Sequence, residues 1–366
     1  MPDSRAGVLD GRYPRHIDVR TFSPPELGPG GELVLRTIMC GVCGSDLHRF
    51  IAPGAGEVIL GHEILGVVER TNGQWLGATG VPLNVGDLVV PETRIPCHRC
   101  EYCRGVGSRP EKLLDYSHCP NQRGLGGIPI DDAPLLSGGW SDYVELPHGA
   151  IVHRIDPAMN PDLAVLLEPF SIAMKAVRLA GLTGDDTVIV LGPGPIGLLT
   201  VVAAVEAGAR KVILAGTAGD AERLALGREL GAHHTIDVTA GDLLDAIRRL
   251  NRGRLATRAI DTTGSVRGFE LGIAVLARGG VMVTVGGSSL DATASVSPTD
   301  LVMRQIDIRA SQLGANHYES CLALLAAGRY PLERLVTHRF DLPHVEDALR
   351  TFEQRGPCIK PVIVFT

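Results

Sequence analysis

A glycine-rich turn between an apolar strand and an apolar helix constrains the fold of this chain more than any other segment. Residues 192–197 read Gly-Pro-Gly-Pro-Ile-Gly, directly after the short β-branched run Thr187–Leu191. Gly192 permits a tight turn, Gly194 lets the backbone approach a pyrophosphate, and Gly197 lets the helix pack closely on the strand. The first turn of the helix then offers free N–H groups to an anion. The segment therefore predicts a strand–turn–helix unit that binds a dinucleotide.

Strands and helices continue to alternate beyond this turn. Lys211–Ala215 reads as a second strand, and Asp220–Leu230 reads as a helix that ends at Gly231. Later strands are expected at Ala259–Asp261 and Val281–Val285. Such alternation is typical of a parallel, doubly wound sheet, so the predicted fold class is α/β.

The N-terminal part of the chain has a different texture. From about residue 30 to about residue 150 it is rich in Gly, Pro and Val, with short alternating runs such as Glu32–Thr37 and Asp87–Val90. Runs of this kind, separated by turn residues, indicate a compact and mostly β domain. A helix is expected near Tyr318–Ala327 and an apolar run at Pro361–Phe365. We expect this C-terminal part to return to the first domain and complete it.

Length and charge narrow the class of protein. At 366 residues the chain can form two domains, or one domain interrupted by another. A formal net charge of −6, without a basic run, argues against a nucleic-acid partner, because phosphate contacts need clustered Lys and Arg. The most apolar stretch, Val188–Val205, carries Pro193, Pro195 and several glycines. We therefore expect no membrane helix there, and the N-terminus lacks an apolar core of signal-peptide length.

The eight cysteines are distributed unevenly. Four lie between residues 97 and 119, and Cys43 lies in a Gly-Val-Cys-Gly-Ser-Asp segment, whereas Cys40, Cys321 and Cys358 are isolated. This distribution indicates metal ligands in a reducing compartment rather than a disulfide framework. We therefore expect a cytoplasmic protein.

A four-cysteine lobe is the stronger of two metal motifs. Cys97, Cys100 and Cys103 are separated by two residues each, and Cys119 follows. Short gaps of this kind let successive sulfurs point at a common centre, and four thiolates close a tetrahedral zinc shell, which is structural rather than reactive. The charged segment Arg109–Asp115 is expected to form an excursion before the fourth ligand. His98 and His118 are possible substitutes if Cys119 cannot reach the ion.

The second metal motif combines a thiol with an imidazole and a carboxylate. Cys43 is followed downstream by Gly61-His62-Glu63. Thiolate, imidazole and carboxylate are all zinc ligands, and a catalytic site uses three of them and keeps one position open. Alone, Cys43 reads as a small buried residue and His62 as a core histidine. The pair, upstream of a dinucleotide fold, favours a metal, with either Glu63 or Glu168 as third ligand.

The end of the second strand bears on the choice of dinucleotide. A carboxylate there binds the ribose 2′-hydroxyl of NAD. Here the strand runs into Ala215-Gly-Thr217-Ala-Gly219, with no acid before Asp220. The missing carboxylate removes a repulsion against a 2′-phosphate, and Arg223 lies close enough in sequence to face one. The cofactor is therefore expected to be NADP or NAD, with a preference for NADP.

Taken in order, these motifs resemble the zinc-dependent medium-chain dehydrogenase/reductase superfamily, and most closely its polyol (sorbitol-type) and sugar dehydrogenases. The resemblance extends over nearly the whole chain. It is carried by these segments: Gly41–His48, Gly61–Glu63, the Cys97–Cys119 lobe, Glu168-Pro169, Gly192–Gly197 and Leu335–Phe340. Two departures are a long gap before Cys119 and a short interval between Cys43 and His62, which implies a trimmed loop at the substrate mouth.

The resemblance implies the domain layout. A GroES-like, β-rich catalytic domain would comprise residues 1–160 and 311–366, including the zinc lobe at 97–119. A Rossmann domain would comprise residues 161–310. The family also implies a homodimer or a homotetramer.

The resemblance further implies roles for individual residues. Cys43, His62 and Glu63 would hold a catalytic zinc, with Glu168 on or beside the metal. Ser45 would bond the reacting alcohol, and His48 would relay its proton to solvent. The dinucleotide would be bound by the following residues: Gly192, Gly194, Ile196, Gly197, Thr217, Arg223, Val285 and Gly286.

The predicted activity is hydride transfer between a secondary alcohol and a nicotinamide cofactor. Ser45, Asp46, His48 and Glu168 make the expected pocket polar, which favours a sugar, polyol or cyclitol-like substrate. The alternatives are a zinc-free quinone or enone reductase of the same superfamily, a non-catalytic dinucleotide-binding scaffold, and a zinc-ribbon interaction module. Metal content distinguishes them, with about two zinc ions per chain on the first interpretation and about one for a structural lobe alone.

Overall fold

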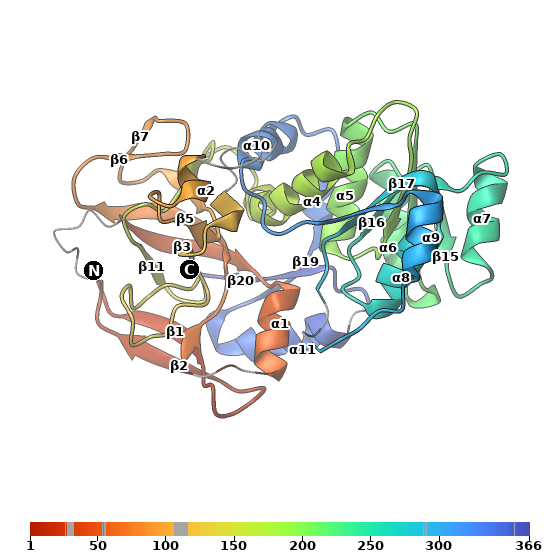
Figure 1. The fold of residues 1–366 in the computed structure, drawn as a ribbon. Helices are drawn as coiled ribbons and strands as arrows, with labels where there is room; N and C mark the ends of the chain where they lie inside the picture. Colours follow the sequence, from red (N-terminus) through yellow and green to blue (C-terminus); the bar gives the residue numbers. More distant parts are fainter. Residues whose placement is uncertain are drawn as a thin grey trace. The chain divides into compact units, whose positions relative to one another are not determined.

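The computed structural model describes residues 1–25, 27, 33–52, 54, 56–105, 116–287, 289, 291–354 and 356–366 (Figure 1). These residues form two compact units. The first contains Met1–Glu168, Tyr318–Ala327 and Glu333–Thr366, and the second contains Pro169–His317 and Gly328–Leu332. The expected excursion at Arg109–Asp115 and the residue Glu32 lie outside the described residues.

The first unit is built on a mostly antiparallel sheet of seven strands within the described residues. Six of them follow the order β12-β8-β5-β3-β20-β19, and β11 also pairs with β3. Their bounds are β3 Leu33–Gly41, β5 Glu63–Thr71, β8 Leu88–Pro91, β11 Tyr143–Leu146, β12 Val152–Arg154, β19 Val336–Phe340 and β20 Lys360–Val364. The last strand of the chain therefore lies beside β3.

Shorter strands and helices complete this unit. The remaining strands are β1 Ser4–Leu9, β2 Ile17–Phe22, β4 Val58–Ile59, β6 Trp75–Leu76, β7 Pro82–Leu83, β9 Arg94–Ile95 and β10 Arg123–Gly124. The helices are α1 Gly44–Ile51, α2 Glu101–Arg104, α3 Pro161–Ala164, α10 Tyr318–Ala326 and α11 Val345–Gln354, with short 3₁₀ turns at Tyr116–His118, Leu332–Leu335 and Leu342–His344. The core between these elements is apolar and contains Leu35, Ile64 and Trp140, each at most 1% exposed.

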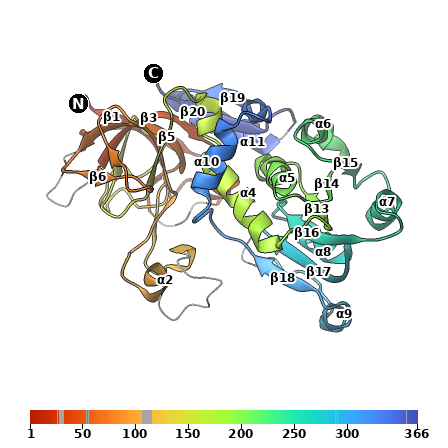
Figure 2. The same cartoon turned by 90° about the horizontal axis from the view of Figure 1, so that it is seen from above.

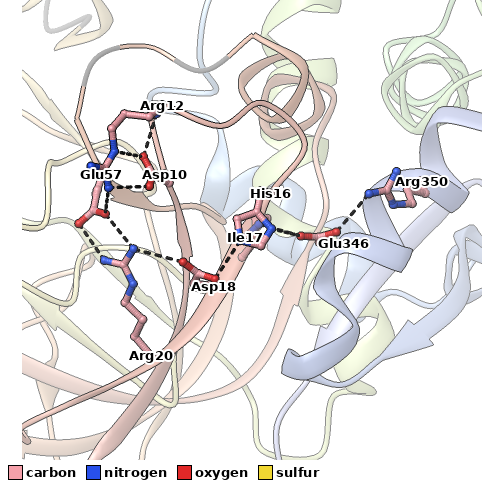
Figure 3. A network of polar contacts seen from close by, with 9 residues as sticks. All are labelled: Asp10, Arg12, His16, Ile17, Asp18, Arg20, Glu57, Glu346 and Arg350. Atoms are coloured by element: carbon pink, nitrogen blue, oxygen red, sulfur yellow. Dashed lines mark hydrogen bonds and ion pairs between the residues drawn. The ribbon is translucent and has the colours of Figure 1, made fainter.

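A polar network joins the N-terminal strands to the C-terminal helix of this unit (Figure 3). The backbone N–H of Ile17 donates to Oε1 of Glu346 on α11 at 2.8 Å. Glu346 also accepts a hydrogen bond from Arg350 at 3.2 Å. Elsewhere in the network, Arg20 donates to both carboxylate oxygens of Glu57 at 2.8 Å. Partly exposed contacts of this kind contribute little individually, but the bond from Ile17 to Glu346 connects the two ends of the chain within one unit.

The second unit is a parallel sheet with strand order β15-β14-β13-β16-β17-β18. The strands are β13 Thr187–Leu191, β14 Lys211–Gly216, β15 His234–Asp237, β16 Ala256–Asp261, β17 Leu276–Thr284 and β18 Asp307–Ala310. The helices are α4 Leu167–Ala180, which starts in the first unit, and α5 Pro195–Glu206, α6 Ala221–Glu229, α7 Leu243–Leu250, α8 Val266–Ala274 and α9 Pro298–Arg304, with a 3₁₀ turn at Ala218–Asp220. The order reverses at β13, where a doubly wound sheet binds its ligand.

Alternating side chains explain why helices cover both faces of this sheet (Figure 2). Ile189 and Ile213 belong to one apolar cluster with Ile247 of α7 and with residues of α8. On the other face, Leu214 packs against Gly227 of α6. A Cβ at Gly227 would lie 2.2 Å from Cδ2 of Leu214. Successive strand residues point to opposite faces, so a fully apolar strand needs helices on both.

The predicted fold class is confirmed: a β-rich region and a parallel sheet covered by helices are both present. Within the described residues, no helix is long and apolar enough to cross a membrane.

Candidate active site

Cys43, His62 and Glu63 are brought together by the start of a helix and the start of a strand. Cys43 caps α1 with extended backbone angles, and Glu63 is the first residue of β5. Gly61 has φ +85°, a conformation that favours glycine, and so turns the chain just before His62. One donor atom from each of the three residues lies within 4.8 Å of the other two. They can therefore share one metal ion.

Asp46 contacts the backbone of Cys43 and the side chain of His62. Its Oδ2 accepts the backbone N–H of Cys43 at 3.0 Å, and its Oδ1 lies 3.4 Å from Nδ1 of His62. Burial alone would raise the pKa of Asp46, but His62 and two backbone N–H groups together lower it. A carboxylate on Nδ1 leaves Nε2 of the imidazole to face a metal, as in carboxylate–histidine–zinc arrangements.

Lys360 neutralises Glu63 from the last strand of the chain. Its ammonium lies 2.6 Å from both carboxylate oxygens of Glu63 and donates to the carbonyl of Val42 at 3.1 Å. Both side chains are buried. Burial alone would lower the pKa of Lys360, yet Glu63 and the other anionic groups nearby raise it. The pair keeps a charged carboxylate inside an otherwise apolar sheet.

Glu168 lies beside the donor cluster rather than in it. Its Oε1 accepts a hydrogen bond from the hydroxyl of Thr93 at 2.8 Å, and the same hydroxyl lies 3.5 Å from the carbonyl of His62. Burial, reinforced by Glu63, raises the pKa of Glu168 to about 7. The three-residue donor group contains Glu63 and not Glu168.

Ser45 and His48 lie on one face of α1. They are three residues apart, which makes them neighbours on a helix surface. Both are exposed, in contrast to Asp46 and Phe50 of the same helix. The helix therefore points Asp46 inward, toward His62, and leaves a hydroxyl and an imidazole accessible.

The four cysteines of the lobe also converge. The sulfurs of Cys97, Cys100, Cys103 and Cys119 all lie within 4.8 Å of one another. Backbone N–H groups, Arg99 foremost, lower the pKa of the Cys97 thiol to about 6, whereas burial raises the pKa of Cys103 to about 12. Of the two histidines considered as substitutes, His98 bonds the carbonyl of Gly149 at 2.8 Å, and neither belongs to the sulfur cluster. Four sulfurs in this arrangement fit a closed zinc shell.

The glycine turn of the second unit has the close approach that its sequence predicts. Gly192 has φ +94°, and Gly194 caps α5 with Pro195 in the first helical turn. A Cβ at Gly197 would lie 1.8 Å from the carbonyl oxygen of Gly192. A Cβ at Gly194 would meet nothing within 4 Å. Gly197 is therefore required by packing, whereas Gly194 leaves open space at the N-terminus of a helix.

The end of β14 lacks a carboxylate directed away from the strand. Gly216 occupies the last position of β14, where a Cβ would lie 2.8 Å from Pro193 of the glycine turn. The carboxylate of Asp220 turns back to accept the backbone N–H and the hydroxyl of Thr217 at 2.9 and 2.7 Å. Arg223 is buried, with Nη1 3.8 Å from Oδ1 of Asp220. Thr217 is exposed, and Arg223 is not.

The other predicted dinucleotide residues lie at the same end of the sheet. Ile196 is in the first turn of α5, where its carbonyl accepts the Thr200 hydroxyl at 2.7 Å. The N–H groups of Val285 and Gly286 both point at the carbonyl of Asp261, at 2.9 and 3.3 Å. These residues follow the carboxyl ends of β13 and β17, which is the edge where parallel sheets bind ligands.

Sequence reasoning missed two residues of the metal cluster's surroundings. Lys360 carried a signal, because a lysine inside the apolar run Cys-Ile-Lys-Pro-Val-Ile-Val is costly to bury without a partner. Thr93 carried none, because a threonine between Glu92 and Arg94 is unremarkable in sequence.

Two family models match the chain. One describes an alcohol dehydrogenase GroES-like domain over residues 29–157, and the other a zinc-binding dehydrogenase over residues 195–327. Among curated proteins, a probable alcohol dehydrogenase of Mycobacterium tuberculosis is 31% identical over 98% of this chain and 96% of its own. A 5-exo-hydroxycamphor dehydrogenase of Pseudomonas putida is 31% identical over 94% of both chains. Sorbitol dehydrogenase of Bacillus subtilis is 28% identical over 95% of this chain and 94% of its own.

Solved structures of dehydrogenases match this chain over the full length of both chains. An alcohol dehydrogenase of Thermotoga maritima matches with a TM-score of 0.89 at 26% identity. A putative zinc-binding dehydrogenase of Sinorhizobium meliloti, bound to NADP, matches with 0.85 at 26% identity. An Escherichia coli alcohol dehydrogenase complexed with NADH matches with 0.84 at 25% identity.

Proposed function

Because this chain belongs to the zinc-type medium-chain dehydrogenase superfamily, as an alcohol dehydrogenase close to the polyol dehydrogenases, we propose that it transfers a hydride between a secondary alcohol and a nicotinamide cofactor. The substrate is of the polyol, sugar or cyclitol-like class. The two ends of the chain form the catalytic domain, and the parallel sheet between them binds the dinucleotide.

The observation that carries this proposal is the group formed by Cys43, His62 and Glu63. A thiolate, an imidazole and a carboxylate are three protein ligands, the number that a catalytic zinc uses while one position stays open. Zinc held there would lower the pKa of a substrate hydroxyl, as it does for bound water. The four-cysteine lobe, with its closed set of thiolates, is assigned a structural zinc.

The polar side chains around the metal group have separate tasks. Asp46 holds the His62 ring, and Lys360 holds the Glu63 carboxylate, so neither ligand is free to rotate. The Ser45 hydroxyl accepts the proton of the substrate alcohol and passes it to His48. Since His48 is exposed, its imidazole can pass that proton on to water.

The nucleotide site supports use of both NAD and NADP. The nicotinamide ring accepts the hydride, and this chemistry belongs to the cofactor. Gly216 and the inward-turned Asp220 offer the ribose no carboxylate that would repel a 2′-phosphate. Arg223, however, is buried against Asp220 and supplies no exposed charge for that phosphate. We therefore expect turnover with either dinucleotide and a preference for NADP of less than about tenfold, since only a repulsion is relieved.

The donor group also argues against two of the alternatives. A zinc-free quinone or enone reductase needs no thiolate, imidazole and carboxylate in one place. A zinc-ribbon module needs no second metal group and no dinucleotide turn. Both motifs are present in the described residues.

We further propose that the chain forms a homodimer through β18. Among the described residues β18 is one of the two edge strands of the parallel sheet, and its four residues are exposed. On α9, Val302 is 74% and Met303 61% exposed. If two copies of β18 pair antiparallel about Ile308, Asp307 of one copy faces Arg309 of the other.

Light scattering should give twice the chain mass for the wild type, and Ile308→Lys should give the mass of the monomer. A monomeric wild type would refute the assignment.

Turnover of a panel of alcohols and sugars, followed by nicotinamide absorbance with NAD and with NADP, tests the proposed reaction. Cys43→Ala and His62→Ala should each abolish turnover and leave dinucleotide binding, measured by calorimetric titration, within about twofold of wild type. Cys321→Ser, at a buried cysteine outside both groups, is the control and should retain activity. Parallel loss of dinucleotide binding in the two variants would mean that Cys43 and His62 are structural.

A further inference from the structure

Arg94 is a half-buried arginine for which the described residues provide no counter-ion. It begins β9, next to Thr93, and its Nε is buried without a hydrogen-bond partner. Among the described residues no carboxylate forms an ion pair with its guanidinium. By contrast, an Asp or Glu pairs with each of four other arginines of this unit: Arg5, Arg15, Arg20 and Arg339. A guanidinium withdrawn from water is costly unless an anion accompanies it. Within the described part of the chain, no anionic group is in contact with Arg94.

A second arginine, Arg49, lies near Arg94, and both contact the glycine-rich segment Gly124–Gly127. Arg49, on α1, donates from Nη1 to the carbonyl of Gly126 at 3.0 Å. A Cβ at Gly127 would lie 2.9 Å from that Nη1, and a Cβ at Gly124 would lie 2.2 Å from Nη1 of Arg94. The segment Gly124–Gly127 is therefore in contact with one guanidinium at each end. Side chains in place of these two glycines would displace both groups.

This segment and both arginines belong to the neighbourhood of the metal group. A Cβ at Gly126 would lie 2.9 Å from the carbonyl of Gly61, the residue before His62. Thr93, the residue before Arg94, bonds Glu168. Burial and the charge of Arg49 lower the pKa of Arg94, and Glu168 only partly offsets them, which places the three charged groups within electrostatic range of one another.

Arg49 also shares a helix face with the residues assigned to proton transfer. It follows Ser45 by four positions on α1, and residues at this spacing lie on the same side of a helix. Ser45, His48 and Arg49 are all exposed. An alcohol whose hydroxyl reaches Ser45 would thus have a guanidinium about one helical turn away, roughly 6 Å.

We propose that Arg94 and Arg49 bind an anionic group of the substrate, so that the alcohol oxidised here carries a phosphate or a carboxylate. This inference rests on the proposed function and specifies its substrate class. A planar guanidinium bonds carboxylate and phosphate oxygens in pairs, and the anion gives Arg94 the counter-ion that the described residues do not provide. Neutral polyols lack that group and bind less tightly.

Three substrates on one carbon skeleton test the proposal: sorbitol, sorbitol 6-phosphate and gluconate. With the zinc-loaded enzyme, one of the two acidic compounds should exceed sorbitol in kcat/KM by on the order of 10- to 100-fold, the worth of a hydrogen bond to a charged group. The phosphate and carboxylate arms distinguish the two anions. Arg94→Met should reduce this preference to within about threefold of unity, chiefly through KM, and Arg94→Lys should restore part of it.

The control is Arg123→Met, at an exposed arginine of β10 that neighbours Gly124. It removes the same charge from the same strand pair and should leave the acid-to-neutral ratio unchanged. Equal loss in Arg123→Met would mean that the preference reflects general surface charge, and it would overturn the assignment. Sorbitol preferred over both acids, with no response to Arg94→Met, would overturn it as well.

A measurement without turnover separates this inference from the proposed function. Inorganic phosphate, added to the zinc-loaded protein in calorimetric titration, should bind wild type at least tenfold more tightly than Arg94→Met. If Arg94→Met does not fold, Arg49→Met on the exposed face of α1 gives the same comparison. Phosphate binding that depends on Arg94, without turnover of any alcohol, would refute the reaction and not the anion site. Turnover of sorbitol without such binding would refute the anion site alone.

Discussion

The ammonium of Lys360 lies 2.6 Å from both carboxylate oxygens of Glu63, and the two residues are 297 positions apart in the chain. Lys360 is 2% exposed and Glu63 is 1% exposed. Each charge is therefore compensated mainly by the other. The contact joins the last strand of the chain to the residue that follows His62, so the metal group depends on the C-terminal strand.

Replacement of Lys360 by Met should destabilise the first unit and empty the proposed catalytic metal site. Removing one partner of a buried ion pair leaves an uncompensated charge and costs about 3–5 kcal/mol. Urea unfolding measures this cost, because the two tryptophans, Trp75 and Trp140, are both buried in the first unit and report on it alone. Zinc content should fall by about one ion per chain.

Arg15→Met is the control for this change. Arg15 also donates to both oxygens of a glutamate, Glu353, at 2.8 Å, but the two side chains are 40% and 35% exposed. An exposed pair is worth less than about 1 kcal/mol. Similar losses in Lys360→Met and Arg15→Met would show that burial of the Lys360–Glu63 pair does not govern its energy.

Two substitutions in the glycine turn should distinguish its role in packing from its role in dinucleotide binding. Gly197→Ala places a Cβ 1.8 Å from the carbonyl of Gly192 and should lower the calorimetric melting temperature of the second unit by several degrees. Gly194→Ala meets nothing within 4 Å in the protein, so it should leave the melting temperature within about 1 °C and weaken dinucleotide binding at least tenfold. Normal dinucleotide binding by Gly194→Ala would mean that the backbone at this position does not approach a pyrophosphate.

The fold was predictable where the pattern is local. Thr187–Leu191, a run of apolar and β-branched residues bounded by polar and glycine residues, is β13 without a change of bounds. The start of β17 was harder to predict. The strand begins at Leu276, five residues before the predicted Val281. The sequence did not indicate this start, because Ala277–Gly280 interrupts the apolar run. Pairing with β16, which shifts register in this region, extends the strand through that polar segment.

In the candidate site, too, contacts between residues close in sequence were predictable, and contacts between distant residues were not. Cys43 and Asp46, or Cys97 and Cys100, are three residues apart, so a short motif can place them. Lys360 contacts Glu63, and Thr93 contacts Glu168, only because β20 and β5 flank β3 and β8 lies beside β5 in the folded sheet. Their contacts depend on strand order, which residue spacing does not contain.

Each metal group should account for one zinc ion. Cys100→Ser should lower zinc content from about two ions per chain to about one, and Cys43→Ala should do the same from the other group. Cys321→Ser is the control, since Cys321 is buried and belongs to neither group. Elemental analysis of the purified proteins measures the three contents. A zinc content unaffected by Cys100→Ser would refute the structural site.

Stability should fall as the pH rises above neutrality, because of a histidine held between two carboxylates. Nδ1 of His153 lies 2.5 Å from Oε1 of Glu319, and Nε2 lies 3.0 Å from Oε1 of Glu92. Burial alone would lower the pKa of His153, but the two carboxylates together raise it. The folded state therefore retains a proton that the unfolded chain releases near pH 6.5.

The sign of this effect follows from the raised pKa. The stabilisation is complete below about pH 6.5 and is lost as the pH passes through the higher pKa of the folded state. Burial also raises the pKa of Glu92, so the contribution of Glu92 to stability likewise decreases as the pH rises. Urea unfolding of the zinc-loaded protein, followed by tryptophan fluorescence, should thus give a lower free energy of unfolding at pH 8.5 than at pH 6.5.

Glu319→Gln isolates the contribution of one carboxylate. Its side chain is half exposed on α10, so the substitution leaves no buried charge of its own, and it removes one of the two groups that hold the proton on His153. The decline in stability should then begin at a lower pH than in wild type. Identical pH profiles for wild type and Glu319→Gln would mean that the proton on His153 does not contribute to the folding of this unit.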